Sequence, residues 1–197
     1  MPMPSQAPVL TPELLKVIKI FGLLSVSIVL VLSFFNEYRA DNTGTDDPHS
    51  MTDSNYLYFK NVRRLHYEID KNPATKLEIY RLDKRLKGEN LIFVNLSIIV
   101  SRIRNKAYIY IEPADKLKSV TTVEISWQKN GSEQGMLSFQ QGDRMSHHRF
   151  VCELYPLIDE KTEFKVKIAG KWLPILVSDK ERQAFKTTTE DYLQLIK

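Results

Sequence analysis

The sequence predicts an α+β protein with one N-terminal transmembrane helix, followed by a mainly antiparallel β, sandwich-like domain with two helices. Three observations carry this expectation. Residues 14–35 form a long apolar run, residues 56–177 contain several strand-like segments joined by turn signals, and two helical segments in the second half begin at capping residues. The strands and helices do not alternate as βαβ units do, which disfavours a parallel sheet.

The apolar run reads LLKVIKIFGLLSVSIVLVLSFF, and Lys16 and Lys19 are its only charges. As an α-helix it would be roughly 33 Å long, enough to cross a hydrocarbon core of about 30 Å. A cleaved signal peptide is the main alternative, but residues 34–36 and 38–40 lack the small-x-small pattern of a cleavage site. A buried core helix is the other alternative. The run favours a membrane span.

Basic residues near the apolar run predict its orientation. Lys16 and Lys19 lie at its N-terminal end, whereas Arg39 is the only Lys or Arg between the run and Lys60. The positive-inside rule then places the N-terminus in the cytoplasm. We therefore expect four parts: a short cytoplasmic tail (1–13), a transmembrane helix (14–35), a linker (36–54), and a periplasmic or extracellular α+β domain (55–197).

The first half of this domain is expected to be rich in strands. Residues 56–69 favour a strand, with a helix as the alternative, and residues 77–82 predict a shorter strand. Residues 91–103 alternate branched apolar residues on one face, and a turn at 104–106 leads into 107–112, so the two segments predict a hairpin. In the second of these strands Tyr108 and Tyr110 share a face.

Turn and capping signals organise the second half. Asn130-Gly131 predicts a hairpin between 120–128 and 135–140, with a loop over 129–134 that is longer than the tightest hairpin. Asp143 predicts a helix from 144 to about 158, and Ala169-Gly170 a hairpin between 163–168 and 171–177. Ser178 and Glu181 form a capping box that predicts a final helix to about 196.

Candidate catalytic chemistry is sparse. Cys152 is the single cysteine, and on a helix His148 would share its face. A zinc site needs further ligands, and a Cys–His nucleophile needs an oxyanion hole and a third orienting group. The sequence shows neither, so it predicts no catalytic residue, metal site or cofactor and favours a non-enzymatic role. Basic and aromatic residues alternate over 58–67, but no RNA-binding signature accompanies them, so nucleic acid is not an expected partner.

The surfaces that remain favour contact with a membrane and with another protein. Lys and Arg outnumber Asp and Glu over residues 51–118 and balance them over 119–197. We expect an anchored interaction or structural module, an accessory part of an envelope complex, that uses Tyr108, Tyr110, Arg63 and Arg64. The alternatives are an anchored enzyme acting on a surface polymer and a ligand-binding adaptor. For the tyrosines, burial under the C-terminal helix is the competing expectation.

Overall fold

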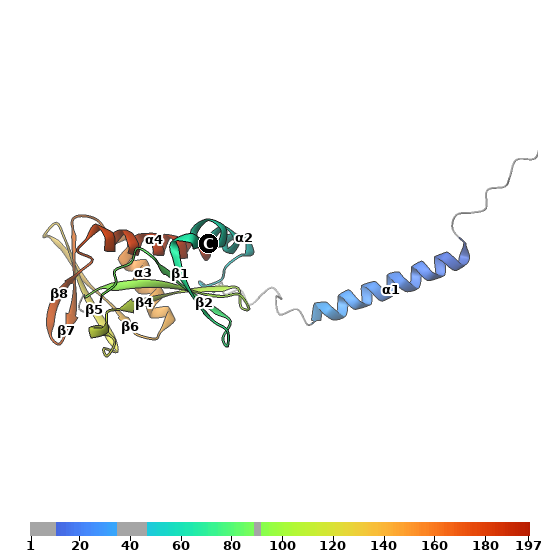
Figure 1. Ribbon diagram of the computed structural model, residues 1–197, viewed down its shortest axis with the longest axis horizontal. Helices are drawn as coiled ribbons and strands as arrows, with labels where there is room; N and C mark the ends of the chain where they lie inside the picture. Colours follow the sequence, from blue (N-terminus) through green and yellow to red (C-terminus); the bar gives the residue numbers. More distant parts are fainter. Residues whose placement is uncertain (1–10, 35–46, 89–91) are drawn as a thin grey trace, which may run out of the picture. The chain divides into compact units, whose positions relative to one another are not determined.

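A computed structural model describes residues 11–34, 47–88 and 92–197 (Figure 1). The chain divides into two compact units, residues 1–45 and 46–197, which we describe separately. The first contains the helix α1 (Pro12–Phe34), which confirms the predicted apolar helix. Its segment Pro12–Leu32 is long and apolar enough to cross a membrane. The hydroxyl of Ser27 donates to the carbonyl of Leu23 (2.8 Å), so this polar group is satisfied within the helix.

The second unit has two antiparallel sheets of four strands each, together with helices, and confirms the α+β prediction. The first sheet has the order β1-β2-β3-β4 and the second β6-β5-β7-β8. The strands are β1 (Tyr67–Asn72), β2 (Leu77–Leu82), β3 (Val94–Ser101), β4 (Lys106–Pro113), β5 (Thr122–Lys129), β6 (Glu133–Gln140), β7 (Thr162–Ile168) and β8 (Lys171–Ile175). The α-helices are α2 (Asp53–Tyr58), α3 (Arg144–Leu154) and α4 (Asp179–Leu195).

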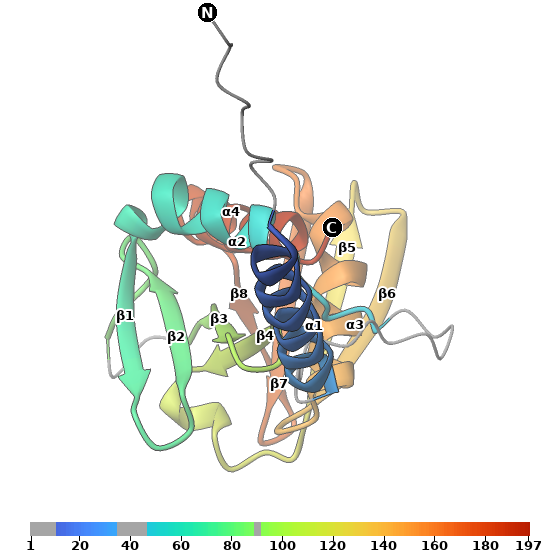
Figure 2. The same cartoon turned by 90° about the vertical axis from the view of Figure 1, so that its right-hand side faces the viewer.

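The first sheet has one apolar face and one mixed face. Alternate residues of β3 and β4, such as Ile98 and its partner Ile109, point to the apolar face and are buried. The helix α4 packs along this face, with α2 beside it (Figure 2). The predicted hairpin of 91–103 with 107–112 is confirmed, although its first strand begins only at Val94. The opposite face of the same strands carries the polar and aromatic residues that form the candidate site.

Tight turns build the second sheet as the turn signals predicted. Ala169 and Gly170 have φ values of 48° and 80°, and they join β7 to β8 as a two-residue turn. Asn130 and Gly131 also have positive φ values. Because Lys129 pairs with Glu133, the loop between β5 and β6 is shorter than the 129–134 expected from the sequence.

Both predicted helices are confirmed with their caps. The carboxylate of Asp143 accepts from the backbone N–H of Met145, and a short 3₁₀ turn (Tyr155–Leu157) continues α3. Both halves of the capping box between Ser178 and Glu181 are present at the start of α4. The helix α3 packs against β4 of the first sheet and β6 of the second, so the two sheets share one core.

The N-terminal part of the second unit differs from the prediction. The expected strand over 56–69 is wrong for most of its length: α2 continues into a π-helical turn η1 (Phe59–Arg63) and a 3₁₀ turn η2 (Arg64–His66), and β1 starts at Tyr67. Aromatic and branched residues suggested a strand, but packing of Phe59 against the apolar face decides for a helix.

The folded unit also begins earlier than residue 55. Of the predicted linker, residues 36–46 lie outside the described residues, whereas 47–54 belong to the folded unit. Ser50 forms a β-bridge with Lys106, the first residue of β4, and the neighbouring His49 is 1% exposed. This segment looked like a linker because it is polar, yet its histidine is a core residue.

Candidate interaction surface

The mixed face of the first sheet contains a hollow lined by the two predicted tyrosines. Ile99 of β3 and Tyr108 of β4 are direct partners across the sheet, and Tyr110 follows two residues along β4. The hollow has a volume of about 460 Å³. Its lining residues, here called the tyrosine groove, are Thr75, Leu77, Ile99, Ser101, Ile103, Arg104, Tyr108, Tyr110 and Arg144.

Strand alternation places the tyrosines in this groove. Ile109 and Ile111 are 1% and 4% exposed on the apolar face, so Tyr108 and Tyr110 must point the other way. The helix α4 covers the isoleucine side. The competing expectation, burial of the tyrosines under the C-terminal helix, is therefore wrong. Both tyrosines are half-buried. The Tyr110 ring lies 4.8 Å from the ring of His147, and the Tyr108 ring lies 5.0 Å from that of His49.

Two arginines make the rim of the tyrosine groove cationic. Arg144, at the first turn of α3, holds its guanidinium 5.6 Å from the centroid of the Tyr108 ring, within range of a cation–π interaction. Arg104 lies in the turn between β3 and β4. Within the described part of the chain neither arginine forms an ion pair, and both are exposed. Positive charge without a carboxylate partner thus borders an aromatic and aliphatic floor.

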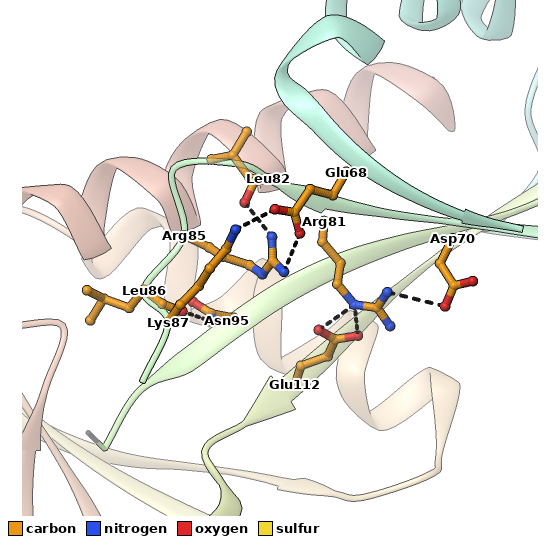
Figure 3. Close-up of polar contacts among 9 residues, drawn as sticks. All are labelled: Glu68, Asp70, Arg81, Leu82, Arg85, Leu86, Lys87, Asn95 and Glu112. Carbon is orange, nitrogen blue, oxygen red and sulfur yellow. Dashed lines mark hydrogen bonds and ion pairs between the residues drawn. The ribbon is translucent and has the colours of Figure 1, made fainter. Parts of the chain in front are cut away.

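A polar cluster occupies the other end of the same face, and its charges are satisfied internally (Figure 3). Arg81 of β2 donates to both carboxylate oxygens of Glu112 on β4, at 2.8 and 2.9 Å. Arg85 and Lys87 hold Glu68 of β1, and their hydrogen bonds lower the pKa of Glu68 to about 2. Because each cation faces a carboxylate, this cluster joins the edge strands and offers little free charge to a ligand.

The predicted pair Arg63 and Arg64 lies away from the tyrosine groove. Arg63 donates through Nε to Asp191 of α4 (2.7 Å), whose second carboxylate oxygen accepts from the hydroxyl of Tyr67 (2.6 Å). Tyr67 is buried on the apolar side of the first sheet, where it contacts the ring of Phe59. The structure therefore assigns Arg63 a bond to a buried carboxylate and separates the two arginines from the two tyrosines.

Comparison of this chain with protein-family models, with curated proteins and with solved structures gives no match. The assignment of a role therefore depends on the geometry of the described residues.

A cluster of buried and half-buried imidazoles lies next to Tyr108 of the tyrosine groove. The hydroxyl of Tyr192 on α4 contacts Nδ1 of His49 (3.0 Å) and Nδ1 of His148 on α3 (2.8 Å). The ring of His49 lies 5.0 Å from that of Tyr108. Sequence reasoning missed this cluster, since no local pattern connects His49 with partners on two distant helices.

The pair that looked reactive in the sequence is part of this cluster. His148 Nε2 lies 3.8 Å from the Sγ atom of Cys152. Burial raises the pKa of the Cys152 thiol, which is opposite to the shift that activates a nucleophilic cysteine. Among the described residues, no group of three or more His, Cys, Asp or Glu side chains could hold a metal ion.

Proposed function

We propose that this chain is a membrane-anchored interaction module that binds an acidic segment of a partner protein in its tyrosine groove. One observation carries the proposal: two tyrosines form the floor of the groove, and two arginines that pair with no carboxylate among the described residues form its rim. Tyrosine combines a large apolar area with a polar tip, and arginine pairs with carboxylates in two-pronged geometry. Aspartate or glutamate next to an apolar side chain complements both features.

The proposal includes an anchor and an orientation. The helix α1 is long and apolar enough to cross a membrane, and Lys16 and Lys19 near its N-terminal end favour a cytoplasmic N-terminus. The folded unit then lies outside the cytoplasm, in an envelope complex. Protease treatment of sealed cells or spheroplasts that express the chain with tags at both ends should remove the C-terminal tag alone. Loss of the N-terminal tag alone would reverse the orientation.

Charge reversal on the groove rim tests the binding role. The variant Arg104→Glu with Arg144→Glu should greatly reduce the recovery of partner proteins from detergent-solubilised membranes, because two carboxylates would repel an acidic segment. Its unfolding midpoint should change little, since exposed substitutions outside the core usually cost less than about 0.5 kcal/mol.

The matched control is Lys116→Glu with Lys171→Glu, which changes the net charge equally at exposed positions outside the groove. It should leave partner recovery unchanged. Equal loss with both pairs would show a response to net charge alone, and unchanged recovery with the groove pair would remove the proposal.

A further inference from the structure

The segment between α2 and β1 exposes a cluster of apolar side chains. Four apolar residues within nine positions, here called the apolar strip, have large exposed fractions. They are Leu57 (53%), Tyr58 (49%), Val62 (48%) and Leu65 (82%). Single exposed apolar residues are ordinary, but a contiguous group marks a surface that contacts something else.

The local winding of the helix explains why the strip faces outward. Thr52 caps α2 through its hydroxyl, which accepts from the N–H of Asn55 (3.2 Å). Tyr56 and Phe59, three residues apart, are 8% and 1% exposed and face the first sheet. The π-helical and 3₁₀ turns that follow continue this orientation, and they leave Leu65 outside.

Positive charge without an internal partner accompanies the strip. Lys60 and Arg64 lie between its members, and the structure shows no ion pair for either within the described residues. A hollow of about 630 Å³ borders the same segment and includes Lys84 and Lys180 on its wall. Asp83 and Asp179 also line this hollow, and Arg63 on its wall pairs with Asp191. Lys60 and Arg64 are not among the lining residues, so their positive charge is separate from that of the hollow.

We propose that the apolar strip rests on the surface of an anionic lipid bilayer. Aliphatic side chains, a tyrosine and flanking Lys or Arg are the chemistry of a segment that lies in the membrane interface. Lipid phosphates would supply counter-charges to Lys60 and Arg64, which pair with no acid in the described ranges, and each such pairing strengthens attachment to an anionic surface. An apolar protein interface would leave the two charges without partners.

Chain connectivity makes this occupant available. Residues 35–46 separate α1 from the folded unit and extend by at most about 3.5 Å per residue. Once α1 spans a bilayer, the folded unit therefore stays within a few nanometres of lipid. The inference rests on the proposed anchor, and the experiment must separate the failure of one from the failure of the other.

The test uses the full chain reconstituted into proteoliposomes, with a single spin label at Leu65→Cys in a Cys152→Ser background. The vesicles contain phosphatidylcholine alone, or phosphatidylcholine with about one third phosphatidylglycerol. The collision rates of the label with oxygen, which concentrates in lipid, and with a water-soluble nickel chelate report its surroundings. In the vesicles that contain phosphatidylglycerol, we expect the oxygen-to-nickel ratio of the Leu65 label to be several-fold higher than that of a label at Met136→Cys. Met136 is 62% exposed on the second sheet.

Each outcome has one meaning. Vesicles that float without the protein would remove the anchor. Flotation with a Leu65 label as accessible to nickel as the Met136 label would overturn the lipid contact and leave the anchor intact. In vesicles that contain phosphatidylglycerol, Lys60→Glu with Arg64→Glu should lower the ratio at Leu65, whereas Lys116→Glu with Lys171→Glu should not. Equal effects of both pairs would overturn the role of the two charges.

Discussion

Mild acid should destabilise the folded unit, because three of its imidazoles are held neutral by their surroundings. His49 contacts the Tyr192 hydroxyl through Nδ1 and the sulfur of Met145 through Nε2, at 3.0 and 3.2 Å. His147 accepts the backbone N–H of Ile111 at Nδ1 (2.9 Å), and its buried Nε2 has no hydrogen-bond partner among the described residues. His148 shares the Tyr192 hydroxyl with His49.

Burial lowers the pKa of all three imidazoles, and the neighbouring charge of His148 lowers the pKa of His49 further. Arg144 and Lys106 act in the same direction on His49, whereas Asp47 opposes them.

The direction of the pH effect follows from proton counting. An unfolded chain binds protons near pH 6.5, whereas the folded unit resists them to lower pH. The stabilising contribution is complete above about pH 6.5 and is lost as the pH falls through the lower folded pKa values. Each imidazole can contribute up to about 1.4 kcal/mol per pH unit, so three give at most about 4 kcal/mol per unit.

Carboxylates titrate at a lower pH than these imidazoles, so the two effects on stability occur in different pH ranges. Hydrogen bonds from Lys87 and Arg85 lower the pKa of Glu68 from 4.5 to about 2, so its stabilising effect is present above about pH 4.5 and lost below it. A decline of stability between about pH 6.5 and pH 5 therefore reports the histidines.

Tryptophan fluorescence during urea unfolding measures the effect in the full chain in detergent. Both tryptophans, Trp127 and Trp172, lie in the folded unit, so α1 adds no signal. The midpoint should fall steeply between about pH 7 and pH 5, and His147→Leu should reduce that slope. His66→Gln is the control, because His66 is exposed. A midpoint independent of pH over this range would refute the reasoning.

Two further substitutions test one contact at each sheet. Gly135→Ala would place a Cβ 2.7 Å from Nε1 of Trp127, so we expect a loss of about 1–3 kcal/mol and a shifted tryptophan emission; an unchanged spectrum would contradict the close approach. Asp191→Ala would leave Arg63 and the Tyr67 hydroxyl without their acceptor and should cost about 1–3 kcal/mol in urea unfolding. Recovery of stability in the double variant with Arg63→Met would support this cause, and no loss in the single variant would exclude it.

Local signals predicted most of the fold. Strand alternation over 94–100 marked one buried face, and the positions it selected are almost fully covered in the structure. Asp143, Ser178, Asn130 and Ala169-Gly170 act within a few residues of themselves, through backbone hydrogen bonds or positive φ angles. Such features are encoded in short stretches, and therefore a single sequence shows them.

Long-range packing accounts for the errors. Residues 56–66 have the composition of a strand, but they wind as a helix, in which Phe59 contacts the rings of Tyr67 and Tyr80. His49 lies in a polar stretch, and its partner Tyr192 is 143 residues away. No periodicity connects positions so far apart, because the contact depends on how α4 crosses the first sheet.

The candidate site was predictable in part for the same reason. Alternation in β4 places Tyr108 and Tyr110 on the face opposite Ile109, which the sequence indicated. It gave no signal that Arg104, in a turn, and Arg144, at the start of α3, would line the same groove. Their convergence depends on the position of α3 at the edge of β4.

The two proposed contacts use opposite faces of the first sheet, and this separation has a measurable consequence. The apolar strip follows from Phe59, which packs on the face that α4 covers, whereas Tyr108 lies on the other face. A lipid surface and a partner segment can then be bound at the same time. When Lys60→Glu and Arg64→Glu are combined with the groove pair, the change in partner-binding free energy should equal the sum of the changes caused by each pair alone. Distant sites add in this way within about 0.5 kcal/mol. Strong non-additivity in partner recovery from the same membranes would show that lipid contact positions the groove, and that the two surfaces act as one.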